Sequence, residues 1–224
     1  MADIILETWD DVEHYIDTSL ISIPPSYFEK IVQGNYPKDA FSKGQLASKA
    51  WLLGELSNIA PIKSHATTVA ILGSWIGSMV EFLHSYAVID RIYGIDIDPV
   101  AIELSEQLNQ KHVQNSWAYK GVVADVASLN SSAMQFETGG ELIDVKPDWL
   151  INTSCEHMDT HWFDTADCEQ LIVMQTNDSP QYEGHINTCA SEFEMWDKYP
   201  LSERLYSGLL KTPADTRFMQ IGYK

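Results

Sequence analysis

The stretch that decides the fold is Ala70-Ile71-Leu72-Gly73-Ser74-Trp75-Ile76-Gly77-Ser78. Its apolar start completes a run from Thr68, which predicts a buried strand. Gly73 then lets the backbone turn and pass close to a ligand. The helical pattern after Gly77 would direct unpaired N–H groups toward that turn. A strand, a glycine turn and a helix in this order favour a ligand-binding α/β sheet, although two glycines at this spacing could serve packing alone.

An acidic residue ends each of the next two predicted strands. In Tyr93-Gly94-Ile95-Asp96 the acid follows Gly73 by 23 residues. In nucleotide-binding sheets, an acid at this place accepts hydrogen bonds from ribose hydroxyls. Asp125, followed by Val126, ends the third strand, where an adenine amino group could bind. Either acid could instead be only a helix cap, but three such features at successive strand ends favour a nucleoside cofactor.

The remaining pattern predicts a doubly wound α/β fold with a mostly parallel, seven-stranded sheet. Short apolar runs predict parallel strands at 68–72, 91–95, 121–124, 149–151 and 170–175, and helical patterns lie at 78–86 and after Asp98-Pro99. The segments 204–211 and 217–223 flank a turn at 212–215 and predict an antiparallel C-terminal hairpin. A helix is predicted at 188–198, with Phe193 and Trp196 inward.

An N-terminal helical cap is expected over residues 1–60, followed by one compact domain over 61–224. The turn residues Pro24, Pro25 and Gly34 interrupt the cap. Residues 42–59 have apolar side chains spaced three and four apart, which predicts a helix. Its apolar positions are Leu46, Ala50, Leu53 and Leu56, and the polar positions beside them, interpreted as a solvated face, are Lys43, Gln45, Ser48 and Lys49.

The charge of the chain argues against a nucleic-acid partner. Thirty-two acidic residues against 14 Lys and Arg give a net charge of −18, which would repel a phosphate backbone. No run approaches the ~20 apolar residues of a membrane span, and the acidic start does not resemble a signal peptide. We therefore expect a cytoplasmic protein that binds neither membranes nor nucleic acid.

Over residues 67–224 the sequence resembles a class I S-adenosylmethionine (SAM)-dependent methyltransferase. The resemblance rests on the glycine loop, Asp96, Asp125 and the terminal hairpin. It implies that Gly73 and Gly77 lie against the methionine part of SAM, that Asp96 holds the ribose, and that Asp125 contacts the adenine. The full set of cofactor-binding residues expected on this resemblance is Gly73, Ser74, Trp75, Gly77, Asp96, Ile97, Asp125, Val126 and Asn152.

Two residues depart from the family pattern. Ile71 occupies a position that is often acidic, and Trp75 one that is often a further glycine, so the hold on the amino-acid end of SAM is expected to differ. On the resemblance, Lys49 or Gln45 of an N-terminal helix would meet the SAM carboxylate. An NAD-binding Rossmann domain fits less well, because G-x-G-x-x-G is absent and that fold requires no C-terminal hairpin.

The acceptor is expected beyond strands four and five, which run into polar segments. His157 and His185 are the candidate bases, and Glu156 could orient a histidine or bind a cationic acceptor. Asn152 begins a segment that lacks the two prolines of the (Asn/Asp)-Pro-Pro-(Tyr/Phe) tetrad found in DNA and protein amide methyltransferases. The candidate acceptor-binding residues are Gln175, Asn177, Asn187 and Trp162. Structural roles for these histidines and amides remain open.

The spacing of two histidines would suit a metal site. His157 and His161 are four residues apart and would share one face of a helix near acidic residues. No complete ligand motif accompanies them, so no metal is predicted.

The sequence as a whole predicts transfer of a methyl group from SAM to a small soluble acceptor, with S-adenosylhomocysteine as product. The alternatives are another SAM-dependent reaction, such as aminopropyl transfer or SAM breakdown, and a non-catalytic SAM-binding protein. The expected partner is the small-molecule acceptor, and a homodimer remains open.

Overall fold

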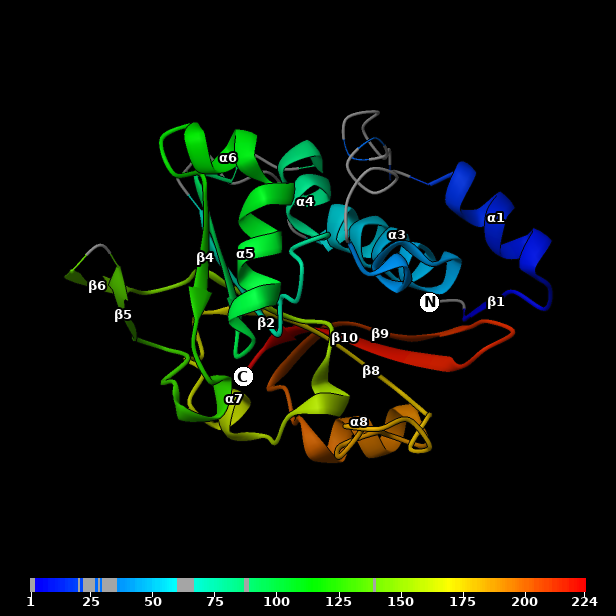
Figure 1. The fold of residues 1–224 in the computed structure, drawn as a ribbon. Coiled ribbons are helices and arrows are strands. Elements are labelled where there is room, and N and C mark those ends of the chain that lie inside the picture. The colour runs from blue at the N-terminus through cyan, green and yellow to red at the C-terminus, as the bar shows by residue number, and fades with distance from the viewer. Residues whose placement is uncertain are drawn as a thin grey trace.

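The computed structural model describes residues 3–19, 21, 27, 29, 36–59, 67–86, 89–138 and 140–224. Within these ranges, an eight-stranded sheet has helices on both faces (Figure 1). Its strands are β1 (Ile4–Ile5), β2 (Thr68–Leu72), β3 (Arg91–Asp96), β4 (Tyr119–Val123), β7 (Trp149–Asn152), β8 (Leu171–Asn177), β9 (Glu203–Lys211) and β10 (Thr216–Tyr223). The helices are α1 (Trp9–Asp17), α3 (Lys43–Ile59), α4 (Val80–Tyr86), α5 (Pro99–Leu108), α6 (Gln110–Gln114), α7 (His161–Asp164) and α8 (Glu192–Lys198).

The strand order is β1-β9-β10-β8-β7-β2-β3-β4. The strands from β8 to β4 are parallel, whereas β10 is antiparallel to both β8 and β9. This arrangement confirms the predicted fold class, including the C-terminal hairpin. The chain leaves β2 in one direction along the sheet and later returns to its other side through β7. Ligands of open α/β sheets bind at such a reversal, beyond the carboxyl ends of the strands.

The predicted seven-stranded sheet gains an eighth strand from the N-terminus. β1 pairs in parallel with β9, with Ile4 opposite Leu210. The sequence analysis did not predict this strand within the N-terminal cap. The three apolar residues between Asp3 and Glu7 are too short a run to show a periodicity that would distinguish a strand from a helix.

Helix α3 anchors the N-terminal segment to the sheet. All four predicted apolar positions are buried, as is Trp51, whose indole N–H donates a 2.9 Å hydrogen bond to the Tyr206 hydroxyl. Leu6 and Val12 belong to the same apolar cluster as the residues of α3, α4 and the covered face of the sheet. The cap and this face therefore share one hydrophobic core.

The other face of the sheet is covered by α7, α8 and a separate hairpin (Figure 1). That hairpin pairs β5 (Met134–Thr138) with β6 (Glu141–Val145). It was not predicted, although Met134 and Phe136 are buried and alternate with exposed Gln135 and Glu137. This alternation of buried and exposed positions is the ordinary signal of a strand with one face in the core.

Helix α8 begins at Glu192, with Ser191 as its N-cap, rather than at residue 188. Phe193 is 69% exposed, so its predicted inward orientation was wrong, and Met195 is the buried residue of this helix. Trp196 is half-buried, and its indole N–H donates a 2.8 Å hydrogen bond to Ser207 Oγ.

Several expectations fall outside the described residues. Pro24, Pro25 and Gly34 are among them, as is the proposed boundary between residues 60 and 61. The division into a cap and a domain therefore stays a prediction. Among the helices described, none combines the length and apolar character needed to cross a bilayer.

Candidate cofactor and acceptor site

The glycine loop after β2 has a left-handed backbone at three positions. Gly73 and Gly77 have φ values of 64° and 66°, and Trp75 between them has a φ of 48°. A side chain in this region costs about 1–2 kcal/mol, which glycine avoids. Trp75 therefore has a backbone conformation that favours glycine, and it stands at the position where the family that this sequence resembles often has a glycine.

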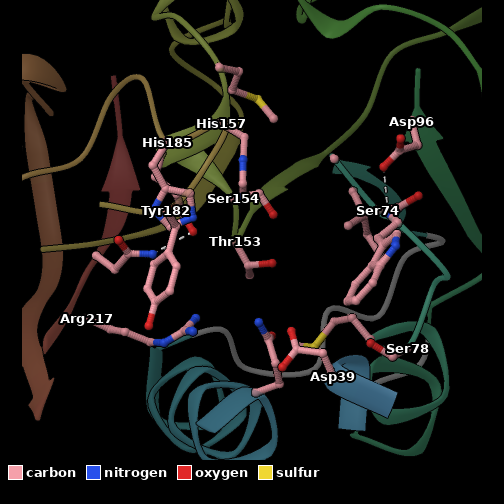
Figure 2. Close-up of a pocket in the computed structure, with 18 of the residues that line it drawn as sticks. Asp39, Ser74, Ser78, Asp96, Thr153, Ser154, His157, Tyr182, His185 and Arg217 are labelled. Atoms are coloured by element: carbon pink, nitrogen blue, oxygen red, sulfur yellow. Dashed lines mark hydrogen bonds between the residues drawn. The ribbon is translucent and has the colours of Figure 1, made fainter. Parts of the chain in front are cut away.

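Asp96 is joined directly to this loop. Its Oδ2 accepts a 2.7 Å hydrogen bond from the Trp75 N–H (Figure 2). Its Oδ1 accepts a 3.0 Å hydrogen bond from the Asp98 N–H. A carboxylate has about four acceptor positions, so each oxygen can still accept a hydroxyl proton. The acid that ends β3 is thus fixed by backbone donors and remains able to hold a diol.

Asp125 follows β4 at the next strand end. Its Oδ1 accepts a 2.9 Å hydrogen bond from the Ala127 N–H, which caps the short helix Val126–Ser128. Ile97 is 67% exposed and lines the same cavity, together with Asp125 and Val126. Two apolar side chains next to an acceptor are suited to a flat aromatic base with an amino group.

A cavity of about 970 Å³ joins these residues to the polar segments after β7 and β8. This volume lies at the upper end of the range for small-molecule sites. Figure 2 shows Ser74 and Asp96 on one side, with His157 and His185 on the other and Thr153 between them. We call the wall formed by the ends of β2, β3 and β4 the cofactor wall, after the role predicted for it from the sequence, and the wall formed by the segments after β7 and β8 the polar wall.

The polar wall brings together the three residues proposed for chemistry. Glu156 and His157 lie in one turn of 3-10 helix after β7, whereas His185 lies in the loop after β8. Two backbone N–H groups of that loop, from Ile186 and Asn187, donate 2.8 and 3.0 Å hydrogen bonds to the Glu156 carbonyl. The two imidazole rings consequently lie perpendicular to each other, with their centroids 4.6 Å apart.

Glu156 is a buried acid, only 5% exposed. Its Oε1 accepts a 2.9 Å hydrogen bond from Asn177 Nδ2, and its Oε2 has no hydrogen-bond partner among the described residues. Burial raises the pKa of this carboxyl, and the positive charge of Arg217 opposes that shift. Asn177 also lines the cavity, and its role in binding the acceptor stays a prediction.

Arg217 lines the cavity although the sequence analysis did not single it out. It reaches the site through the C-terminal hairpin, because β10 pairs with β8 so that Arg217 lies opposite Asn177. Its Nε lies 3.3 Å from Asp215 Oδ2, so the arginine is held by an acid of its own hairpin. Predicting this neighbour would have required the strand register as well as the hairpin.

Lys49 also lines the cavity, so its interpretation as part of a solvated face was wrong. It is 8% exposed, and its Nζ donates a 3.0 Å hydrogen bond to Gln45 Oε1. Burial, together with the positive charge of Arg217 and against the opposing charge of Asp39, lowers the pKa of Lys49 to about 7. A lysine in this state can accept or release a proton near neutral pH.

Of the other polar positions of α3, one is buried in the structure and one belongs to a solvated face as predicted. Ser48 is buried and donates a 2.7 Å hydrogen bond to Gln175 Oε1, whereas Lys43 is exposed and forms a 2.6 Å ion pair with Glu13. Gln175 in turn donates from Nε2 to the Ser48 carbonyl at 3.2 Å. Gln175 thus fixes α3 on the sheet and is not placed toward an acceptor.

Three further candidates lie behind the cavity surface. Asn152 is fully buried, and its Oδ1 accepts a 3.0 Å hydrogen bond from the Ser154 N–H. Asn187 donates from Nδ2 to the Met158 carbonyl at 3.1 Å. Trp162 is fully buried in the cluster under α7 and α8. These side chains hold the segments after β7 and β8 in place through hydrogen bonds to the backbone and packing in the core.

The cavity also has lining residues that the sequence analysis did not propose for binding. Tyr182 lies edge-on to His185, with ring centroids 5.4 Å apart. The others include Trp9, Asp39, Ser78, Thr153, Ser154, Met158 and Asp215. Most are small or polar residues of loops, for which the sequence carries no periodic signal.

The sequence matches no protein-family model and no curated protein. Solved structures are nevertheless similar in fold. A geranyl diphosphate methyltransferase in complex with GPP and sinefungin has a TM-score of 0.59 at 10% identity, over 95% of this chain and 98% of that one. The magnesium protoporphyrin IX methyltransferase from Synechocystis PCC 6803 with bound SAM has a TM-score of 0.53 at 16% identity, over 97% and 92%.

The N-methyltransferase NodS from Bradyrhizobium japonicum WM9 has a TM-score of 0.52 at 13% identity, covering 79% of this chain and 94% of that one. At these identities the similarity concerns the fold alone. It agrees with the strand order, the reversal at β2 and the antiparallel β10 described above. The chain therefore has the fold of the class I SAM-dependent methyltransferases.

Proposed function

We propose that this chain binds SAM and transfers its methyl group to a small acceptor. The observation that carries the proposal is the single cavity whose cofactor wall faces a wall of titratable side chains. One similar structure holds SAM and another is bound to SAH, in both cases a magnesium protoporphyrin IX methyltransferase. The proposed product pair is S-adenosylhomocysteine and the methylated acceptor.

The cofactor wall supplies a partner for each part of SAM. Asp96 would accept hydrogen bonds from the ribose hydroxyls, and Asp125 would accept one from the adenine amino group. Ile97 and Val126 would enclose the adenine ring, and the loop at Gly73 would pass beside the methionine chain. Gly77 lets that loop pack closely against α5, because a Cβ at this position would collide with Ser105 Oγ.

Lys49 is the candidate partner of the SAM carboxylate. An anion beside a buried amine favours its charged form and would restore the proton that burial disfavours. Gln45, which already accepts a hydrogen bond from Lys49, lines the same part of the cavity. Lys49 and Gln45 would thus hold the amino-acid end of SAM. The usual contacts to that end are expected to be missing, because Ile71 and Trp75 depart from the family pattern.

The polar wall is the proposed place of the acceptor. Methyl transfer is an in-line displacement at the sulfonium, and it requires alignment together with a route for any proton that the acceptor loses. His157 donates from Nδ1 to the Gly184 carbonyl at 3.2 Å, and His185 donates from Nδ1 to the Ser179 carbonyl at 2.8 Å. The Nε2 atom of each neutral ring is therefore a free acceptor. Asn177 and Arg217 would orient polar groups of the acceptor.

The size of the acceptor is inferred from volume and charge. A cavity of about 970 Å³ has room for SAM and a second small molecule. A net charge of −18 disfavours a phosphate backbone as substrate. We infer a soluble metabolite acceptor in the cytoplasm.

A labelling experiment tests the reaction. The purified chain is incubated with SAM labelled either in the methyl group or in the aminocarboxypropyl chain, together with the ultrafiltered small-molecule fraction of a cell extract. Only the methyl label is expected to move to a small molecule, with one S-adenosylhomocysteine formed per transfer. Movement of the aminocarboxypropyl label, or SAM breakdown without transfer, would contradict methyl transfer.

A further inference from the structure

The polar wall contains a cluster that the proposed methyl transfer does not by itself require. Glu156, His157 and His185 each offer one ligand atom, and these three atoms lie within 4.8 Å of one another. The cluster combines two imidazoles with one carboxylate, a set that binds first-row transition metals and leaves coordination positions open. It is formed by two loops that the sequence separates by 28 residues.

Both histidines are oriented as metal ligands usually are. Each donates its Nδ1–H to a backbone carbonyl, His157 to Gly184 and His185 to Ser179, at 3.2 and 2.8 Å. A carbonyl accepts only, so these contacts fix the tautomer and leave a lone pair on Nε2. Ligating histidines in proteins commonly have such a backbone partner on the other ring nitrogen, which fixes the ring orientation.

Glu156 provides the second, independent indication. It is 95% buried, its Oε1 accepts a hydrogen bond from Asn177, and its Oε2 lacks a partner within the described part of the chain, although the residue lines the cavity. A buried carboxylate oxygen left unpaired is costly unless a cation or a donor reaches it. Arg217, whose charge acts on Glu156, has its Nε 3.3 Å from Asp215 Oδ2, and within the described residues it donates no hydrogen bond to Glu156 Oε2. This carboxylate oxygen is therefore left for a cation or another donor to pair.

The backbone brings these ligands close but leaves room for adjustment. The Ile186 and Asn187 N–H groups fasten the His185 loop to the Glu156 carbonyl. Two nitrogen ligands that each lie about 2.1 Å from a tetrahedral metal are roughly 3.4 Å from each other. The ligand atoms here lie within 4.8 Å of one another, so side-chain movements of the order of 1 Å would bring them to that separation. Tyr182 packs edge-on against His185, with the ring centroids 5.4 Å apart.

We propose that Glu156, His157 and His185 bind one divalent first-row transition metal ion, with open coordination positions toward the cavity. Imidazole nitrogens favour zinc, iron, cobalt or nickel over magnesium, which prefers oxygen ligands. In the proposed function, on which this role rests, an acceptor oxygen would bind at an open position. The cation would lower the pKa of that hydroxyl so that its proton is lost to solvent water before methyl transfer, and the histidines would then act as ligands and not as bases.

Metal titration tests the site without measuring activity. Untagged protein, dialysed against a chelator, is titrated with Zn²⁺ by calorimetry and with Co²⁺ by visible absorption, which reports nitrogen ligation and coordination number. One ion per chain is expected. His157→Ala, His185→Ala and Glu156→Gln should each weaken Zn²⁺ binding at least about tenfold, since each removes a ligand.

His161→Ala is the matched control. His161 is exposed and four residues from His157 but lies outside the cluster, so its replacement should leave Zn²⁺ affinity and the Co²⁺ spectrum unchanged. Failure of the wild-type chain to bind either ion would overturn the site, as would unchanged affinity in the three ligand variants or loss of binding in His161→Ala.

SAM binding by the metal-free protein separates this proposal from the proposed function. All four variants are titrated with SAM, which also shows that each retains the folded cofactor wall. If SAM binds and no metal does, the metal site is wrong and the cofactor proposal stands. If metal binds and SAM does not, the assignment of the cofactor wall is wrong while the metal site itself is supported.

Discussion

The backbone N–H of Trp75 donates a 2.7 Å hydrogen bond to Asp96 Oδ2 and thereby joins the glycine loop after β2 to the acid that ends β3. The two features that led from sequence to a cofactor are thus in direct contact. Asp96 fixes the loop through one hydrogen bond and remains free to accept others. Its replacement should affect both the ribose contacts and the loop.

Asp96→Ala is expected to lower SAM affinity by about 1–3 kcal/mol, because hydrogen bonds from the ribose hydroxyls to a charged acceptor are lost. Isothermal titration calorimetry measures the change. Asp98→Ala is the control, since Asp98 caps α5 through a 2.8 Å hydrogen bond from Val100 N–H. That variant should lose about 1 kcal/mol of folding stability with nearly unchanged SAM affinity. Equal SAM affinity in wild type and Asp96→Ala would show that ribose is held elsewhere.

Trp75→Gly and Trp75→Ala separate backbone conformation from side-chain contacts. Both remove the indole, but only glycine removes the cost of a φ of 48°. Trp75→Gly is therefore expected to be about 1 kcal/mol more stable than Trp75→Ala. Urea unfolding measures the two free energies of unfolding. A more stable alanine variant would indicate that the loop does not keep its left-handed backbone.

Lys49→Met tests the buried amine through the pH dependence of stability. The pKa of Lys49 is lowered from 10.5 to about 7, so between these pH values the unfolded chain binds a proton that the folded chain does not. The free energy of unfolding of the wild type should then rise with pH relative to Lys49→Met, by at most about 1.4 kcal/mol per pH unit. Below pH 7 the difference should be constant. Urea unfolding from pH 6 to pH 10 checks this, and parallel curves throughout would mean that Lys49 titrates like an exposed lysine.

Gln175→Leu tests a residue that was expected to bind the acceptor and that the structure connects to α3. The change removes both of its hydrogen bonds with Ser48 and leaves a buried hydroxyl without its acceptor. A loss of about 1–3 kcal/mol in the free energy of unfolding is expected. SAM affinity, measured below the unfolding transition, should change little. A variant with unchanged stability and weakened SAM binding would show that Gln175 contributes to the cavity and not to the attachment of α3.

The fold could be predicted because the parallel strands are short apolar runs, of which β2, β3 and β4 end at or shortly before a glycine or an acid. Asp96 and Asp125 follow directly from that pattern, since the carboxyl ends of parallel strands meet at one edge of the sheet. β1 and the β5–β6 hairpin were missed. β1 is two residues long, and its pairing with β9 depends on a contact more than 200 residues away along the chain.

The polar side of the site was predictable only in part. Glu156, His157 and His185 could be placed beside the cavity because they follow strand ends, and Asn177 because it is the last residue of β8. Gln175 could not be assigned a direction, because β8 is buried along its whole length and shows no alternation. Lys49 and Arg217 line the cavity through the packing of α3 and the register of β10, and neither is a property of local sequence.

Calorimetric titration of the wild-type chain with SAM and with S-adenosylhomocysteine tests the central claim most directly. The structure predicts that both bind at one site per chain and compete with each other, and that Asp96→Ala weakens both. Absence of binding by both ligands would contradict the assignment of the cavity at Gly73, Asp96 and Asp125 as a SAM site.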